Sequence, residues 1–413
     1  MTKQRRLEFT VAVWGAVTFG ALLASSSVFR PVRDSLVLDG NPDNIPWLFV
    51  GTFAGTLLVS PLWSAALGSH GHRRLVPIAF HVFAACAIGF GICVALEIEP
   101  VVVGRVFYIW ASVFNMFVVS VFWSLLADLL GPDTARRLFG PIAAGGTIGA
   151  IAGPALTRVL VGWIGVEGVL VVSAGLLEIA VIAVAQVQRA GESFAREAAA
   201  PAPKRGGPLD GIAQVARSKF LLAIAGYVLC TAITATFLYL EQAKLAKLEY
   251  PDRDARTELF ATIDLGTNLL ALVLQTLLAA PLLKRFGPGI VLLLLPIAQL
   301  AGLSMVVMAP SIAALMFAQI TSRALTHGLT RPSRELLFTV VDRDEKYRAK
   351  NVIDTVVLRF GDVAASFGHT GLLAIGAGTG VLVIASIPVG ALWVACALAL
   401  GVMFRRRKPE EAP

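Results

Sequence analysis

Charged and polar side chains recur at helical spacing inside stretches that are otherwise apolar. Gln319, Arg323 and His327 are four residues apart within 311–330, so a helix would place them on one face. A charge at the centre of a bilayer costs about 2.5–3.5 kcal/mol, so such residues usually face a cavity or a partner. Arg323 cannot lose its proton and needs a carboxylate, a phosphate or water. The pattern indicates either a structural ion pair or a contact with an anionic ligand.

Three further clusters combine cations with carboxylates. Arg33 follows the first apolar stretch, and its alternative environment is a wet loop. Glu241 and Lys244 lie three residues apart, as do Arg359 and Asp362, so each pair would share a helix face. The alternatives are a solvated helix end for the first pair and mutual neutralisation for the second. These residue types otherwise suit recognition of an anion.

The resulting candidate site joins cations from both parts of the chain. We expect the basic side chains to hold an anion, and Glu241 to act as a gate partner. The candidate substrate-binding residues are Arg33, Glu241, Lys244, Arg323, His327, Arg359 and Asp362.

Two other carboxylates lie deep in apolar stretches, Asp264 and Glu178. They are candidate counter-charges or proton carriers, because burial favours the protonated form of a carboxylate. Asp264 has Asn268 one helical turn later, which would place two polar groups on the same face.

Other kinds of chemistry find no support in the sequence. It contains no GxxxxGK phosphate loop, no HExxH and no GxSxG elbow. The four cysteines form no CxxC or Cys/His cluster. We therefore expect no metal, no cofactor and no enzymatic activity. The basic residues lie in short loops between apolar stretches, where they orient a membrane protein, so we expect no nucleic-acid partner.

The elements that must position these residues are membrane-spanning helices. Of 413 residues, 56% are hydrophobic and only 15% are charged, with a mean hydropathy of +0.76. Apolar stretches of about twenty residues are long enough to cross about 30 Å of hydrocarbon. The first helix is expected to continue past Pro31. The expected spans are 9–29, 46–67, 75–96, 101–130, 139–162, 166–187, 218–240, 257–282, 289–309, 311–330, 351–374 and 380–404.

Two halves and one orientation follow. Lys and Arg concentrate on the side that holds both termini, which predicts an inner-membrane protein with cytoplasmic ends. A shift of 211 residues superposes two pairs of cytoplasmic loops, which indicates a duplicated six-helix unit. We therefore predict an all-α membrane protein of about twelve helices in a 6+6 major-facilitator arrangement. Its parts are a bundle at 1–187, a linker at 188–217, a bundle at 218–404 and a tail at 405–413.

Four segments resemble a known family of carriers. They are FRPVRDSLVL, VFWSLLADLLGPDTARRLFGPIAAGGTIGAIAG, LEQAKLAK and RAKNVIDTVVLRFGD. These are similar to segments of the nucleotide transporter (ATP/ADP translocase) family of intracellular bacteria and plastids, a major-facilitator-like branch. The resemblance extends over nearly the whole chain. It implies a twelve-helix carrier and, in characterised members, exchange of ATP for ADP or related nucleotides.

The family's charged positions carry over only in part. Its basic residue after the first helix corresponds to Arg33, after the span 9–29, and its acidic residue closing the seventh helix corresponds to Glu241, after the span 218–240, with Lys244 also matching. Its acidic residue near the start of the fourth helix falls on Ala111 in the span 101–130, and the lysine of its eleventh helix falls on Asp362 in the span 351–374. The resemblance implies transport, while these two departures bear on nucleotide exchange.

The hypothesis that best fits these observations is a secondary carrier of an organic anion, such as a nucleotide or another phosphorylated metabolite, working by alternating access. The expected partners are that anion and the lipid bilayer, and the expected oligomeric state is a monomer. One alternative is a proton-coupled carrier of a non-nucleotide solute. The other is a membrane subunit without transport that serves a partner complex or lipid handling.

Overall fold

The computed structural model describes residues 3–191, 208–374 and 379–407, and their regular structure is helical. Residues 192–207 of the expected linker and 408–413 of the expected tail lie outside the described residues. The chain divides into two compact units, 1–202 with 249–265 and 203–248 with 266–413. The helix α8 (Arg253–Val273) therefore begins in the first unit and ends in the second.

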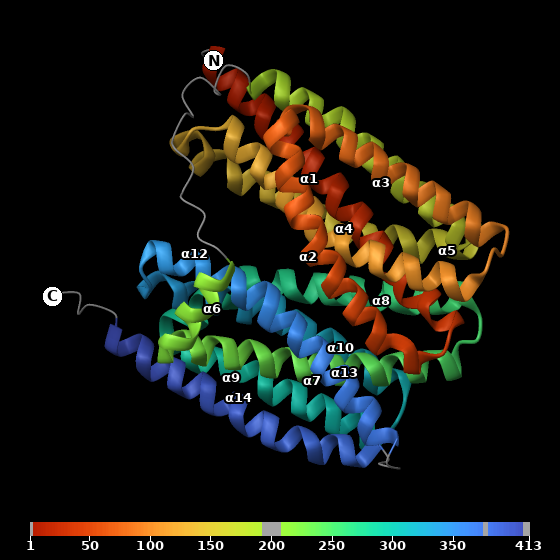
Figure 1. The fold of residues 1–413 in the computed structure, drawn as a ribbon, viewed down its shortest axis with the longest axis vertical. Helices are drawn as coiled ribbons and strands as arrows, with labels where there is room; N and C mark the ends of the chain where they lie inside the picture. Colours follow the sequence, from red (N-terminus) through yellow and green to blue (C-terminus); the bar gives the residue numbers. More distant parts are fainter. Residues whose placement is uncertain (1–2, 192–207, 375–378, 408–413) are drawn as a thin grey trace. The chain divides into compact units, whose positions relative to one another are not determined.

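The first unit is built around two long helices, α1 and α5. Within it, α1 packs along α5 and α4, and α3 packs along α5 (Figure 1). Gly165 is non-helical (φ +66°) and divides α5 into two consecutive helices. The elements are α1 (Lys3–Leu36), η1 (Val37–Asp39), η2 (Pro42–Asn44), α2 (Ile45–His70), α3 (His72–Ala95), α4 (Pro100–Leu129) and α5 (Pro132–Gly191).

The second unit places α9 against α14 and α10 (Figure 1). Gly287 (φ +74°) divides α9 as Gly165 divides α5. The segments η3, η4 and η6 are π-helical. The elements are α6 (Pro208–Arg217), α7 (Lys219–Glu249), α8, η3 (Leu274–Leu278), α9 (Ala279–Met308), α10 (Ile312–Leu325), η4 (Thr326–Thr330), α11 (Arg331–Leu337), η5 (Phe338–Val340), α12 (Arg343–Asn351), η6 (Val352–Val357), α13 (Leu358–Ala374) and α14 (Thr379–Arg407).

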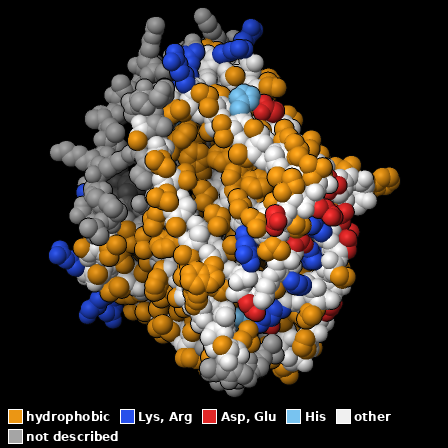
Figure 2. Space-filling view, turned by 45° about the vertical axis from the view of Figure 1, so that its right-hand side comes forward, with side chains coloured by type: hydrophobic (Ala, Val, Ile, Leu, Met, Phe, Trp, Pro, Cys, Tyr) orange, Lys and Arg blue, Asp and Glu red, His pale blue; other side chains and the backbone are white. Residues whose placement is uncertain are grey.

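Every expected span has a helical counterpart. Among the described residues, seven helical stretches are long and apolar enough to cross a membrane. Two of them, Asp133–Gly191 and Arg253–Met308, have 59 and 56 residues. At about 1.5 Å per residue each is long enough to cross about 30 Å of hydrocarbon twice. Apolar side chains gather over the central part of the face shown in Figure 2, while acidic and basic side chains gather along its right-hand side.

Small residues allow α1 and α5 to approach closely. A Cβ atom added at Gly149 would collide with the backbone oxygen of Gly20. Backbone atoms cannot swing aside as a long side chain can, so the glycine is required by the helix spacing. The same relation holds one turn earlier and one turn later, in the pairs Gly145–Ala16 and Gly153–Ala24.

This contact gives a prediction about stability. Gly149→Ala is expected to destabilise the protein by about 1–3 kcal/mol, because overpacking forces the two helices apart. The matched control is Gly140→Ala in the same helix, since a Cβ atom added there would meet nothing within 4 Å. Thermal unfolding in detergent would compare the two. Equal unfolding temperatures for both variants would refute the close-packing explanation.

Candidate functional site

In the first unit, the Arg33 guanidinium is held from several directions. Its Nε and Nη2 atoms donate to Oδ1 of Asp34, at 2.8 and 2.7 Å. Its Nη1 atom donates to Oγ of Ser112 at 3.2 Å, and its Cζ atom lies 4.7 Å from the centre of the Tyr108 ring. Because α1 continues past Pro31, as expected, Arg33 belongs to a helix and not to a loop. The result is an oriented, half-buried cation.

The same face of α1 carries two more polar contacts. Ser26 donates to the side-chain oxygen of Asn115 at 2.7 Å, and Arg30 lies 3.9 Å from Oδ2 of Asp264. Ser26, Arg30 and Arg33 follow each other at four and three residues, which is one helical face. Asp264 is only 2% exposed, and Arg30 of α1 places a positive charge beside it. Asp264 thus contacts a half-buried cation, and its expected role as a counter-charge or a proton carrier stays a prediction.

Beyond the end of α1, Asp39 accepts from two arginines. Nη2 of Arg256 lies 2.5 Å from Oδ1, and Nε of Arg253 lies 3.0 Å from Oδ2. Arg256 is 4% exposed, so this charge is compensated out of water. The start of α8 is tied down further by Ser35, which donates to the Arg253 carbonyl oxygen at 2.8 Å. Residue spacing along the sequence did not predict this network.

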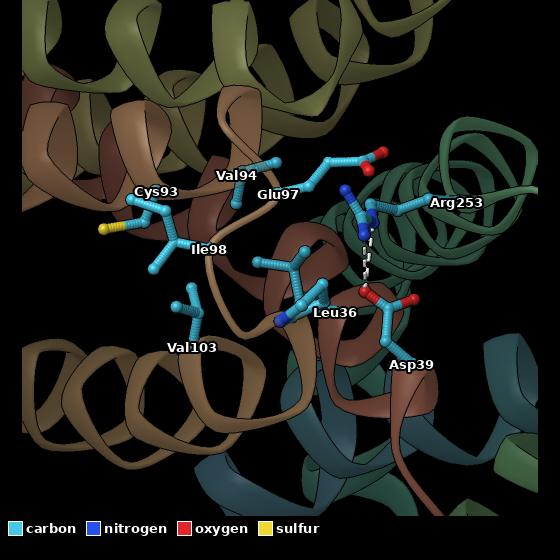
Figure 3. Close-up of a pocket in the computed structure, with 9 residues that line it drawn as sticks. Leu36, Asp39, Cys93, Val94, Glu97, Ile98, Val103 and Arg253 are labelled. Carbon is cyan, nitrogen blue, oxygen red and sulfur yellow. Dashed lines mark hydrogen bonds and ion pairs between the residues drawn. The ribbon is translucent and has the colours of Figure 1, made fainter.

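A small pocket adjoins the network in Figure 3. Leu36, Asp39, Cys93, Glu97 and Arg253 are among its lining residues, and the Glu97 side chain extends toward Arg253. Glu97 has a φ of +51°, which side chains other than glycine rarely adopt. A carboxylate is thus presented by a strained connection between α3 and α4, and the pocket combines two acidic groups with one guanidinium.

In the second unit, Glu241 joins α7 to α13. Its Oε1 atom lies 3.2 Å from Nζ of Lys244 and 2.9 Å from Nε2 of His369. Glu241 is 5% exposed and His369 is 2% exposed. The ion pair between Glu241 and Lys244 follows from their spacing, whereas His369 is 128 residues away along the chain and was not predicted.

Asp362 lies on α13, two turns before His369. It accepts from Nη1 of Arg359 at 3.3 Å and from Oγ1 of Thr236 on α7, also at 3.3 Å. Arg359 and Asp362 therefore form the ion pair that was one of the two alternatives from the sequence. Asp354 lies in the π-helical segment η6, directly before α13, and pairs with Arg334 at 2.6 Å.

The remaining expected residues lie in different settings. Arg323 lies in the last turn of α10, and His327 lies in the π-helical segment η4 that follows this helix. Both side chains are half-buried. Such π-segments often occur at functional sites, because they redirect side chains from the regular helical face. Glu178 lies apart from these clusters. It contacts His81 of α3 at 2.9 Å, and their side chains are 45% and 55% exposed.

The pattern of one protein superfamily covers most of this chain. The Major Facilitator Superfamily matches residues 11–339. The chain belongs to the major facilitator superfamily. This member is thus a multi-pass membrane transporter and not an enzyme. In addition, the TLC ATP/ADP transporter family matches residues 293–404, which agrees with the resemblance found in the motifs.

The related sequences of this superfamily member include adenine nucleotide carriers. ADP,ATP carrier protein 1 of Chlamydia pneumoniae is 23% identical over 219 residues, which cover 47% of this chain and 42% of the relative. The protein of the same name from Chlamydia trachomatis is 21% identical over 221 residues, with the same coverage of 47% and 42%. The chain thus spans less than half the length of either relative.

Solved structures support the fold. The crystal structure of nucleoside transporter NupG has a TM-score of 0.64 at 13% identity, covering 97% of this chain and 98% of that one. A bacterial homologue of the human lysosomal transporter Spinster has a TM-score of 0.61 at 13% identity, covering both chains completely. The fold similarity and the superfamily match confirm the predicted all-α membrane protein with a 6+6 major-facilitator arrangement.

At two positions where the resemblance to the nucleotide transporter family would suggest a particular charged residue, this chain has a different residue. Ala111 is 4% exposed and packs in the apolar core of the first unit. Asp362 is a carboxylate paired with Arg359. Among the described residues, no group of three or more His, Cys, Asp or Glu side chains could hold a metal ion.

Proposed function

We propose that this transporter is a secondary carrier of an organic anion, a nucleotide or another phosphorylated metabolite, and that it works by alternating access. The observation that carries the proposal is a set of oriented cations in both units, each beside a carboxylate. Arg33 with Asp34, Lys244 with Glu241, and Arg359 with Asp362 have this arrangement. A phosphate group is the kind of ligand that would exchange with such a carboxylate.

Binding would use the remaining candidates as well. Arg323 and His327 add a cation and an imidazole from the second unit, while Asp264 and Glu178 stay counter-charge or proton-carrier candidates. In the first unit, the Tyr108 ring lies under the Arg33 guanidinium, and the Asn115 side-chain amide accepts from Ser26 on α1. An aromatic face and an amide are groups that recognise a purine base. The relatives named ADP,ATP carrier support a nucleotide within the broader anion class.

The transport cycle would move 1–187 and 218–404 against each other, with 188–217 as the linker and 405–413 as the tail. We place the protein in the inner membrane as a monomer with cytoplasmic ends, because Lys and Arg concentrate in the loops on that side. Asp39, Arg253 and Arg256 all belong to the first unit, so this network would hold the start of α8 to the end of α1 during the cycle.

The test is counterflow in proteoliposomes that contain the full-length chain. Vesicles preloaded with unlabelled ADP should accumulate external labelled ADP, whereas empty vesicles should accumulate little. A panel of unlabelled nucleotides, sugar phosphates and organic acids as competitors would define the anion class. Each phosphorylated compound of the panel is also tested as the preloaded and labelled solute. If none of them gives counterflow, the proposal is rejected.

The second candidate is a proton-coupled carrier of a non-nucleotide solute, favoured by the burial of Asp264 beside Arg30. It predicts uptake that follows a pH gradient and ignores nucleotides. A membrane subunit without transport predicts neither uptake nor ligand stabilisation. A true ligand at about 100 times its Kd would stabilise the protein by about 2.7 kcal/mol, so thermal shift separates these cases.

The contact between Asp362 and Arg359 yields a charge-specific prediction. If Arg359 binds the anion, Asp362 competes for it, so Asp362→Asn should lower the KM for ADP. A lost interaction of about 1 kcal/mol corresponds to about fivefold. Asp354→Asn is the matched control, because Asp354 pairs with Arg334 instead. A higher KM in Asp362→Asn would show that the carboxylate assists binding and does not compete.

A further inference from the structure

One carboxylate oxygen in the second unit is shared by two donors that differ in chemistry. Oε1 of Glu241 lies 2.9 Å from Nε2 of His369 and 3.2 Å from Nζ of Lys244. Lysine carries its charge at neutral pH, whereas imidazole is the side chain that gains and loses a proton in this range. The hold of Glu241 on Lys244 therefore depends on the charge of its other partner.

The contact with Glu241 determines which ring nitrogen of His369 carries the hydrogen. A carboxylate only accepts hydrogen bonds, so Nε2 of His369 carries the hydrogen that points to Glu241. The lone pair is then on Nδ1, where a further proton would bind. The Phe237 ring, one turn before Glu241, lies 5.9 Å from the imidazole. With 2% exposure, His369 is held in one orientation by α7.

Other charged groups lie on the helical segments α7, η6 and α13. On α13 itself, Asp362 and Arg359 lie two turns or more before His369 and neutralise each other at 3.3 Å. On η6, Asp354 pairs with Arg334. The part of α14 from Ser386 to Phe404 contains no charged residue. On α7, Lys247 follows Lys244 by three residues. Lys244 is the cation in contact with Glu241, so a proton on His369 competes with Lys244.

We propose that His369 is a proton-binding site which controls, through the shared Glu241 carboxylate, whether Lys244 is available to the transported anion. This rests on the proposed function. A proton from solvent binds Nδ1, the imidazole becomes a cation, and its attraction to Glu241 strengthens. Lys244 is then released toward an anionic ligand. Proton and anion binding thereby favour each other, and thermodynamic linkage makes the effect reciprocal.

The experiment measures the KM for ATP counterflow at pH 8 and at pH 6, with the full-length chain in proteoliposomes. The readout is the ratio of the two KM values, which does not depend on the absolute rate. ATP itself takes up a proton in this range, which affects every variant alike. In the wild type, the KM is expected to fall at pH 6 by at least about fivefold more than in His369→Gln. Glutamine keeps a donor for Glu241 but cannot titrate.

A matched control is present in the same chain. His72 contacts Asp128 at 2.5 Å, but the Asp128 side chain is 60% exposed and the pair lies in the first unit. His72→Gln should keep the wild-type ratio. Lys244→Gln should lose it, because the proton acts through Lys244, and this variant decides the matter if His369→Gln does not fold. ATP-linked proton uptake, read by a pH dye inside the vesicles, should be smaller in His369→Gln than in the wild type, by the share that His369 carries.

The outcomes are distinct for the two proposals. If wild-type vesicles show ATP counterflow but His369→Gln and Lys244→Gln keep the wild-type KM ratio, the proton site is wrong and the carrier proposal stands. If wild-type vesicles show no counterflow with ATP, the nucleotide carrier proposal fails, and the proton site that rests on it fails as well.

Discussion

Asp39→Ala is expected to reduce the stability of the first unit by about 3–5 kcal/mol, because it leaves a buried arginine without its carboxylate. Arg256 is 4% exposed, and its Nη2 atom lies 2.5 Å from Asp39. The guanidinium would keep only carbonyl acceptors, such as that of Pro251 at 3.1 Å. The loss also frees Arg253, so the start of α8 would detach from the end of α1.

The measurement is the apparent unfolding temperature in detergent, compared with Asp43→Ala. Asp43 is four residues away and exposed, so its loss should cost little. A double variant, Asp39→Ala with Arg256→Met, should recover much of the stability, because removal of both charges leaves neither uncompensated. Equal destabilisation by Asp39→Ala and Asp43→Ala would show that the network contributes nothing.

The sequence predicted the helices well because hydropathy reports directly on burial in lipid. All twelve expected spans have helical counterparts, and α1 continues past Pro31 to Leu36, as expected. The ends differ most where helices extend beyond the apolar stretch. The helix α7 continues to Glu249, nine residues past the expected end of that span, and so carries Glu241 and Lys244 in regular helix.

Contacts between distant segments could not be predicted from spacing. Glu241 with Lys244, and Arg359 with Asp362, are three residues apart, and helical geometry alone brings each pair together. His369 lies 128 residues from Glu241, and Arg253 lies 214 residues from Asp39. No periodic pattern in one helix reports which residue of another helix will face it.

The setting of Glu178 has a different explanation. In a membrane protein, the surface that faces lipid is as apolar as the interior, so hydropathy does not tell the two apart. Glu178 and Asp264 therefore looked equivalent in the sequence. In the structure Asp264 is buried beside Arg30, whereas Glu178 is half exposed beside His81.

Arg33→Ala is expected to lower ADP uptake by about 10- to 150-fold, since hydrogen bonds to a charged group contribute about 1.5–3 kcal/mol. Arg33→Lys should retain part of the activity, because lysine keeps the charge but loses the planar donor pair that contacts Asp34. Arg136→Ala is the control. Its side chain is 83% exposed, and its 4.0 Å contact with Asp133 is also exposed, so little should change.

One more variant is needed, because Asp34 is only 7% exposed and would lose its ion pair with Arg33 in Arg33→Ala. A fall in uptake would then have two explanations, the loss of this ion pair and the loss of a ligand contact. The double variant Arg33→Ala with Asp34→Asn removes both charges. If Arg33 binds the anion, the double variant stays inactive while its unfolding temperature returns toward the wild-type value. Recovered uptake would instead assign Arg33 to the neutralisation of Asp34, and the anion would have to be held by the cations of the second unit.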